Sequence, residues 1–250
     1  MLWRFEPAWR DREAGIVETL RTVRPDVVGL QETWSGDGTT QPERLAALAG
    51  DLTGVWVPTA LPPTPEEAGA QVGIGLLTRW PIRATEVHDL PHPQRPGPPP
   101  TALLATLDHP RGPLHVIVTC TEWEPHYEAD QRAQNEALAA LATDPRLDGD
   151  LPVLLIGDLN AAADQPVFAP LTGLTDAWAA AGGDPAAATL SSAVPFAPLE
   201  CTHLIDRRID HVLARPGRPG AAVDAVRATL AGDRPEYPSD HFAVVVDLNF

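Results

Sequence analysis

Short apolar runs alternate with segments of helical periodicity along the whole chain of 250 residues. This alternation predicts strands layered with helices, and no heptad pattern indicates a coiled coil. No apolar run approaches the ~18 residues of a membrane-spanning helix. Hydrophobic residues make up 44% of the sequence, enough for a large core, and no Gly/Ser linker divides the chain. We therefore expect residues 1–250 to form a single domain.

The spacing of apolar residues places the expected elements. Apolar residues at helical spacing predict helices at residues 11–23, 43–49 and 128–141, and Arg24-Pro25 ends the first of them. The proline-rich stretch 91–100 predicts an extended surface loop. Short β-rich runs predict strands at residues 26–31, 55–57, 72–77, 102–107, 114–119, 152–156, 209–213, 225–230 and 242–248.

The net charge of the chain indicates which kinds of ligand it can bind. The formal net charge is −16 and every cationic side chain is an arginine, a bias typical of GC-rich coding sequences. So acidic a surface repels a polyanion unless a local basic patch overrides it, which disfavours tight, non-specific binding of nucleic acid. A small phosphorylated substrate remains compatible with this charge. No secretory leader is recognisable, and we expect a cytoplasmic monomer without a membrane span.

Two of the expected apolar strands end in polar residues that are candidates for metal binding or catalysis. Glu32 ends the strand at 26–31, and a carboxylate there suits a hard divalent cation; the alternative is a solvent-facing glutamate. Asp158 and Asn160 follow the strand at 152–156, and Gly157 permits a tight turn. In an extended chain the two side chains would point the same way, whereas the alternative is an Asx turn.

Two further elements bring a carboxylate toward a histidine. Asp210 points opposite to the apolar Ile209, so that it can orient a histidine; the alternative is an exposed aspartate on a strand. Ser239-Asp240-His241 places an acid and an imidazole at the mouth of the last strand, a common arrangement in hydrolytic centres. Each match alone is weak, but four occur in order along one chain.

Together these motifs resemble the endonuclease/exonuclease/phosphatase superfamily. Its members include apurinic endonucleases, pancreatic-type deoxyribonucleases, neutral sphingomyelinases and inositol polyphosphate phosphatases. The resemblance runs from about Asp11 to the C-terminus. It implies an α+β fold, a four-layer αββα sandwich of two packed, mostly antiparallel sheets flanked by helices. The residues that carry it are Leu30-Gln31-Glu32, the segment from Gly73 to Ile82, Gly157-Asp158-Leu159-Asn160, Arg208-Ile209-Asp210-His211-Val212 and Ser239-Asp240-His241.

The resemblance also implies a role for each site residue. Glu32 would bind a divalent metal, Mg²⁺ or Mn²⁺, with Asp240 as a second or water-mediated ligand. Asp158 would position or deprotonate the attacking water, and Asn160 would hold that water or a phosphate oxygen. His241 would bond a non-bridging phosphate oxygen, while Asp210 fixes its tautomer and favours the protonated ring near neutral pH.

The sequence departs from the family pattern in two places. The family opens with a strand ending in an asparagine, and Met1-Leu-Trp-Arg-Phe5 resembles the segment after that asparagine. Either the reading frame starts upstream, our preferred account, or this strand is missing. The second departure is Cys120-Thr121-Glu122-Trp123, where the family usually has Thr-His. His126 could reach in from the loop, or Glu122 could add a carboxylate to the metal site; the alternative is that Glu122 faces solvent.

These residues and the resemblance together predict a metal-dependent phosphoesterase. It would hydrolyse a P–O bond in a small or lipid-derived phosphoester by in-line attack of an activated water. The alternatives are a metal-dependent nuclease of the same fold, which the acidity disfavours, and a catalytically impaired binding module. The resemblance does not identify the substrate, whose recognition we expect from the loops at 91–100 and 190–202.

Overall fold

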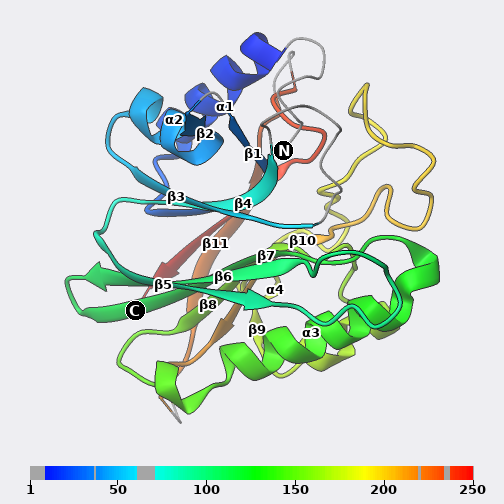
Figure 1. Cartoon of the computed structure of the whole chain (residues 1–250). Coiled ribbons are helices and arrows are strands. Elements are labelled where there is room, and N and C mark those ends of the chain that lie inside the picture. The colour runs from blue at the N-terminus through cyan, green and yellow to red at the C-terminus, as the bar shows by residue number, and fades with distance from the viewer. Residues whose placement is uncertain (1–8, 37, 61–70, 219–220, 234–236, 250) are drawn as a thin grey trace.

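The computed structural model describes residues 9–36, 38–60, 71–218, 221–233 and 237–249. Two β-sheets lie face to face between layers of helices (Figure 1). The expected four-layer α+β sandwich is confirmed, and every strand pair but one is antiparallel. The segment Met1–Phe5, on which the first departure from the family rests, lies outside the described residues.

The first sheet has the strand order β2-β1-β4-β3 and is covered by two helices. Its strands are β1 (Val27–Gly36), β2 (Thr39–Thr40), β3 (Thr53–Pro58) and β4 (Gln71–Thr78). Helix α1 (Trp9–Val23) ends just before β1, and α2 (Gln41–Ala49) begins at a capping box between Thr40 and Glu43. Leu20, Leu45 and Leu77 lie in the apolar layer between these helices and the sheet.

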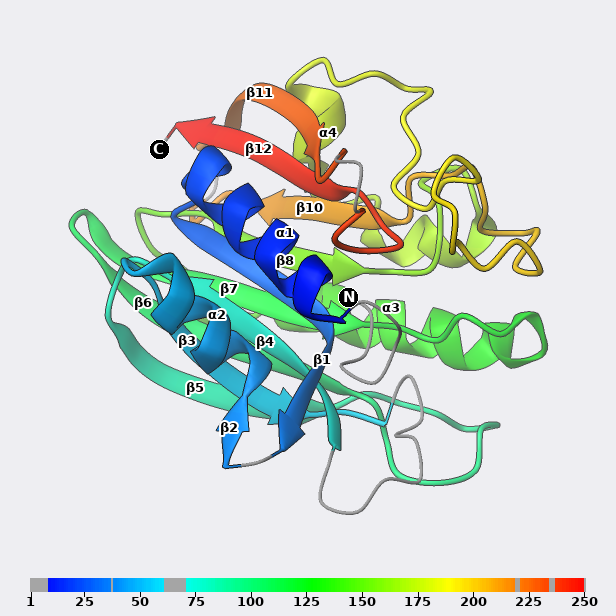
Figure 2. The same ribbon diagram turned by 90° about the horizontal axis from the view of Figure 1, so that it is seen from above.

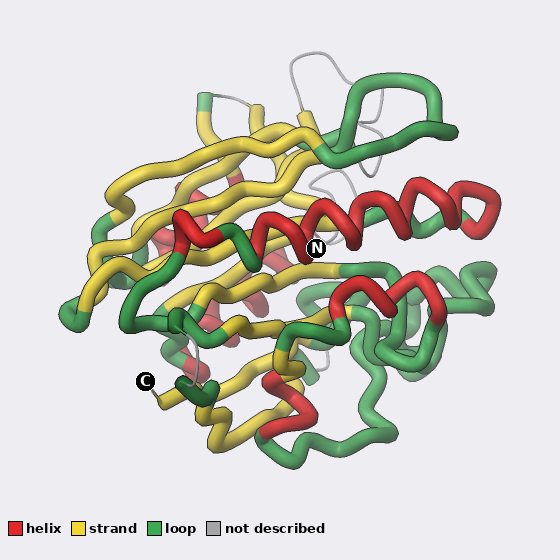
Figure 3. Tube along the Cα trace, turned by 90° about the horizontal axis from the view of Figure 1, so that it is seen from below, coloured by secondary structure: helices red, strands yellow, loops and turns green. Residues whose placement is uncertain are grey.

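The second sheet has the order β5-β6-β7-β8-β10-β9. The parallel pair of β7 and β8 is the exception to its antiparallel pattern. Helix α3 (Glu128–Ala142) crosses the outer face of the sheet (Figure 3). The strands are β5 (Ile82–Asp89), β6 (Thr101–His109), β7 (Gly112–Cys120), β8 (Val153–Asp158), β9 (Thr175–Asp176) and β10 (Asp210–Arg215).

The main core fills the space between the two sheets. Ile74 and Leu76 of β4 face Val116 of β7 and Leu154 of β8 there, all nearly or fully buried. A second apolar layer joins the outer face of the second sheet to α3 through residues such as Leu138 and Leu155. No helix among the described residues is long and apolar enough to cross a membrane.

The last two strands form a ribbon of their own. β11 (Asp224–Ala231) pairs with β12 (Ala243–Asn249), next to the short helix α4 (Ala177–Ala180). The other edge of β12 has no neighbouring strand in the part of the chain that the structure describes.

The predicted helices and strands are all present, with shifted ends, but one long strand was not predicted. β5 was not predicted because its residues, Ile82-Arg-Ala-Thr-Glu-Val-His-Asp89, are mostly exposed and carry charge on both faces of the strand. A strand at a sheet edge can remain polar, since only part of its surface meets the core. The loop at 91–100 is confirmed as an irregular segment.

Candidate active site

Asp158 and Asp210 lie directly opposite one another at the end of the second sheet. β8 and β10 pair antiparallel, and the register matches Asp158 with Asp210. Directly opposed residues of such a pair hold their side chains close together on one face. Burial raises the pKa of Asp158 to about 7, and the neighbouring charge of Asp210 adds to the shift. A carboxyl of this kind can exchange a proton near neutral pH.

The turn after β8 differs from the extended chain that would align Asp158 with Asn160. Asn160 has a φ of +46°, and its backbone N–H donates to Oδ1 of Asp158 at 2.9 Å, so an Asx turn is present. The side-chain nitrogen Nδ2 of Asn160 donates to the carbonyl oxygen of Thr121. Gly157 lies inside the strand rather than in a turn: a Cβ there would come within 2.2 Å of the carbonyl oxygen of Thr119.

His241 is held against Asp210. Its Nδ1 lies 2.8 Å from Oδ2 of Asp210, and both side chains are about one-fifth exposed. Although burial opposes a charged ring, the attraction and hydrogen bond of Asp210 raise the pKa of His241 to about 10. Burial alone would likewise raise the pKa of Asp210, but the charge of His241 lowers it below its usual value. The pair is therefore ionic at neutral pH.

Thr189, which no sequence motif singled out, fixes the start of β10. It is fully buried, and its hydroxyl oxygen accepts from the backbone N–H groups of Ile209 and Asp210 at 3.0 and 3.2 Å. Its neighbour Leu190 forms β-bridges with Arg207 and with His241, and Phe242 donates its N–H to the Thr189 carbonyl. The Thr189-Leu190 segment thus brings the Asp210 and His241 strands together. An isolated threonine offered no signal that could have predicted this.

Glu32 lies in an irregular stretch of β1. The register of β1 against β4 shifts between Leu30 and Thr33, and Glu32 has a φ of +54°. Burial raises the pKa of Glu32, and the negative charge of Asp240 adds to it. Asp240 accepts a hydrogen bond from the Ser239 hydroxyl at 3.3 Å. Glu32 shares a cavity with Asp158, Asp210 and His241, so the four sequence elements meet at one place.

The residues fit a hard divalent cation. Carboxylate oxygens of Asp158 and Asp210 lie within 4.8 Å of each other and of a ring nitrogen of His241. Because the His241 ring is protonated, it has no lone pair for a metal, and the carboxylates are the candidate ligands. Glu32 and Asp240, predicted as the metal ligands, are not part of that compact group. Among the described residues, no ion pair joins Glu32, Asp158 or Asp240 to an arginine. Burial raises the pKa of Glu32 and of Asp158, and the positive charge of His241 offsets this only in part. Clustered carboxylate oxygens suit Mg²⁺ or Mn²⁺.

The second departure from the family pattern has a structural answer. Glu122 is 1% exposed, and its carboxylate binds the guanidinium of Arg95, with an Nη2–Oε1 distance of 2.8 Å. The alternative that Glu122 faces solvent is therefore wrong, and Arg95 neutralises its charge. His126 does not reach inward either: its side chain is 64% exposed beside Glu124. Arg95 belongs to the proline-rich loop, so this ion pair fastens that loop to the end of β7.

The sequence model of the Endonuclease/Exonuclease/phosphatase family matches residues 3–241, and the chain belongs to that family. No match was found among curated proteins. Among solved structures, an endonuclease/exonuclease/phosphatase from Beutenbergia cavernae is 28% identical, with a TM-score of 0.72. The match covers 94% of this chain but only 65% of the length of that protein.

More distant structures share the fold. The human Nocturnin catalytic domain with a bound sulfate anion is 21% identical, with a TM-score of 0.72, and the match covers 97% of this chain and 87% of that one. A truncated TDP2 from Caenorhabditis elegans is 17% identical, with a TM-score of 0.69, and the match covers 95% of this chain and 90% of that one. These similarities concern the architecture.

Proposed function

We propose that the protein is a divalent-metal-dependent phosphoesterase that hydrolyses a P–O bond in a small or lipid-derived phosphoester. The observation that carries the proposal is the grouping of Asp158, Asp210 and His241 at one end of the second sheet, in the cavity that Glu32 also lines. Family membership supports hydrolysis as the reaction class.

The side chains divide the work of an in-line displacement by water. Asp158, with a pKa of about 7, accepts the proton of the attacking water, and the backbone N–H of Asn160 holds the Asp158 carboxylate in place. His241, kept protonated by Asp210, donates its Nε2–H to a non-bridging phosphate oxygen as negative charge develops. When bound by Glu32 and Asp240, Mg²⁺ or Mn²⁺ supplies charge neutralisation at the phosphoryl group.

The acidic balance of the chain favours a small ester over nucleic acid. The formal charge of −16 disfavours a phosphate-tracking surface. Arg95 and Arg208 are already engaged in ion pairs, Arg95 with Glu122 and Arg208 with Asp176. A nuclease would need free cations along a groove.

The test is a hydrolysis screen with Mg²⁺ or Mn²⁺ on p-nitrophenyl phosphate, bis-p-nitrophenyl phosphate and plasmid DNA. We expect turnover of at least one nitrophenyl ester, abolished by EDTA and lowered about a thousandfold in Asp158→Asn. Asp148→Asn is the matched control, because Asp148 lies on the far surface in an ion pair with Arg215. Equal turnover by wild type and Asp158→Asn on every substrate excludes the proposal, and cleavage of DNA alone favours a nuclease.

A further inference from the structure

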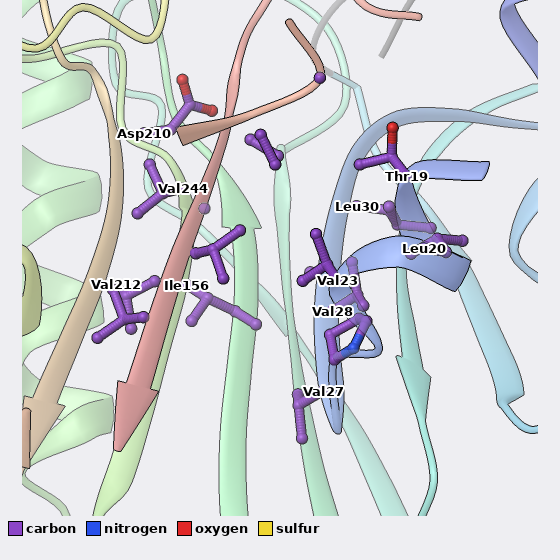
Figure 4. A pocket seen from close by; sticks show the side chains of 18 of the residues that line it. Thr19, Leu20, Val23, Val27, Val28, Leu30, Ile156, Asp210, Val212 and Val244 are labelled. Carbon is purple, nitrogen blue, oxygen red and sulfur yellow. The ribbon is translucent and has the colours of Figure 1, made fainter. Parts of the chain in front are cut away.

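Near the site, the two faces of the second sheet are covered differently. On the inner face, apolar side chains such as Ile156 and Val212 line a cavity that Asp210 borders (Figure 4). On the outer face, α3 begins next to the ends of β7 and β8 (Figure 2). The turns that follow these two strands contact α3 through polar side chains, so the helix can fix where the turns lie.

A row of buried polar side chains occupies the inward face of the first half of α3. Its members are at most 8% exposed, and their spacing places them on one face of the helix. Further along α3 the buried residues are the apolar Leu138 and Ala142. Burial of polar groups costs free energy unless they are hydrogen-bonded, so the partners of this polar row indicate its role. The polar row consists of Asp130, Gln131, Gln134 and Asn135.

Two members of the polar row hold segments that lie beside the turn after β8. The carboxylate of Asp130 accepts the backbone N–H groups of Gln94 and Arg95, in the proline-rich loop, at 2.8 and 2.7 Å. Oε1 of Gln134 accepts the backbone N–H of Glu122, in the turn after β7, at 2.8 Å. One helix therefore sets the positions of two neighbouring segments through their backbones.

Gln131 reaches the turn that follows Asp158. Its Nε2 donates to the carbonyl oxygens of Leu159 at 3.0 Å and of Asn160 at 2.8 Å. The hydroxyl of Thr121 donates to the same Leu159 carbonyl at 2.7 Å. Two side chains from different elements thus hold one carbonyl group.

This carbonyl shares a peptide unit with the N–H of Asn160. A peptide unit is planar, and in its usual trans form the C=O and the N–H point in opposite directions. Whatever holds the Leu159 carbonyl therefore also aims the Asn160 N–H, which donates to Oδ1 of Asp158 at 2.9 Å. The φ of Asn160, +46°, is uncommon outside glycine, so the surrounding contacts must maintain it.

We propose that Gln131 is a positioning residue of the site, which holds the peptide between Leu159 and Asn160 so that the Asn160 N–H stays on the Asp158 carboxylate. Gln131 acts through the turn and touches neither the substrate nor the attacking water. Its expected effect on turnover rests on the proposed function, whereas its effect on the turn does not.

The test compares Gln131→Met with Asn135→Leu. Methionine is about as long as glutamine but has no N–H donor. Asn135 lies one helical turn further along the same buried face, and its Nδ2 donates to the carbonyl of Val167 at 2.9 Å. Val167 belongs to a short 3₁₀ helix, Pro166–Leu171, that does not line the site cavity. Both changes therefore remove the hydrogen bonding of a buried amide on α3, but only one of these amides holds the site turn.

Three quantities are measured for each variant. They are the hydrogen exchange rate of the Asn160 amide, with that of Leu155 in β8 as reference, the stability in urea, and kcat and KM on the nitrophenyl ester that the wild type hydrolyses. Thr121→Val serves as a further variant, because it removes the other donor to the Leu159 carbonyl without altering α3.

We expect Gln131→Met to speed exchange of the Asn160 amide about tenfold and to lower kcat ten- to a hundredfold, with KM changed less than twofold. Asn135→Leu should reduce the stability in urea to a similar degree but should change neither the Asn160 exchange nor kcat. Thr121→Val should also speed exchange of the Asn160 amide.

Unchanged exchange of the Asn160 amide in Gln131→Met, or in Thr121→Val if the first variant does not fold, overturns the proposal whatever the turnover. An equal loss of kcat in Gln131→Met and Asn135→Leu also overturns it, since general destabilisation would then be the cause. A raised KM at unchanged kcat would place Gln131 in contact with the substrate and overturn it as well. Absence of ester hydrolysis by the wild type defeats the proposed function, while the exchange rate of the Asn160 amide still decides the role of Gln131.

Discussion

His241 donates Nδ1–H to Oδ2 of Asp210 at 2.8 Å, and this hydrogen bond determines the charge of the ring. The raised pKa of His241 stabilises the folded state at pH below about 6.5 and loses that contribution as the pH rises through about 10. The lowered pKa of Asp210 contributes stability above about 3.8 that is lost as the pH falls further. The pair therefore stabilises the fold between these limits.

Asp210→Asn should remove the charge that keeps His241 protonated. We expect the pKa of His241, followed by NMR titration of the ring, to fall from about 10 toward or below 6.5. Turnover at pH 8 should drop by roughly a hundredfold or more. Asp247→Asn, on the exposed face of β12 and paired with Arg227, is the control and should change neither quantity. A His241 ring that still titrates near 10 in Asp210→Asn contradicts this assignment.

Asp158 should titrate near neutral pH in the absence of metal. Its pKa is raised to about 7, so its carboxyl signal, followed by ¹³C NMR, should shift between about pH 6 and 8. For a general base, kcat/KM should rise across that range and level off above it. Addition of Mg²⁺ should move both midpoints to lower pH, because a nearby cation favours the carboxylate. A midpoint near 4 without metal would refute the prediction.

Thr189→Val should loosen the junction between β10 and the segment of His241. The change keeps the side-chain shape but leaves the N–H groups of Ile209 and Asp210 without their acceptor. We expect a loss of about 1–3 kcal/mol in the free energy of unfolding, together with a lower pKa of His241. Thr189→Ser restores the hydroxyl and should recover most of both. Equal effects of valine and serine would show that the methyl group, not the hydrogen bonds, matters.

Removal of Arg95 should be costly because it leaves Glu122 buried without its cation. We expect Arg95→Ala to lower the free energy of unfolding by about 3 kcal/mol, measured by urea denaturation. Arg146→Ala, which breaks an exposed pair with Asp144, is the control and should change the free energy of unfolding little, because solvent screens that pair. Adding Glu122→Gln to Arg95→Ala should recover part of the loss. No recovery would mean that packing of the arginine, not the uncompensated charge, dominates.

His211 should weaken the fold in mild acid. Its Nε2–H donates to the carbonyl of Ala161 and its Nδ1 accepts from Arg208, so the ring is neutral. Burial, with the charge of Arg208, lowers its pKa to about 4, whereas the unfolded chain takes up the proton near 6.5. Stability should therefore fall as the pH drops from about 6.5 to 4, by about 3 kcal/mol in all.

His211→Asn is the comparison for this pH dependence, since it removes the titrating ring. The variant should be less stable at pH 8 but should show a shallower loss between pH 6.5 and 4 in chemical denaturation. Parallel curves for the two proteins would exclude His211 as the source.

Periodicity and strand ends in the sequence determined most of the architecture. Leu20 at helical spacing predicted α1, and the apolar run before Asp158 predicted β8. Both predictions succeed because local hydrophobicity indicates whether one face of an element is buried, as in α1, or both faces, as in β8. The polar residues Glu32, Asp158, Asp210 and His241 were recognisable because each lies in or directly beside an apolar strand, at its start, at its end or at an interruption. Strand β5 was not, since an edge strand needs little apolar surface.

Only the tertiary structure decided how these residues meet. The register of β8 against β10 sets Asp158 opposite Asp210, and Thr189 links β10 to His241 across 52 positions of sequence, contacts that no local pattern encodes. The burial of Glu122 likewise depends on its ion pair with Arg95, which belongs to a loop whose sequence has no periodicity. A sequence fixes which side chains prefer burial and which strands can form. Pairing of strand edges, and with it the charge state of buried groups, depends on distances between segments remote in the chain.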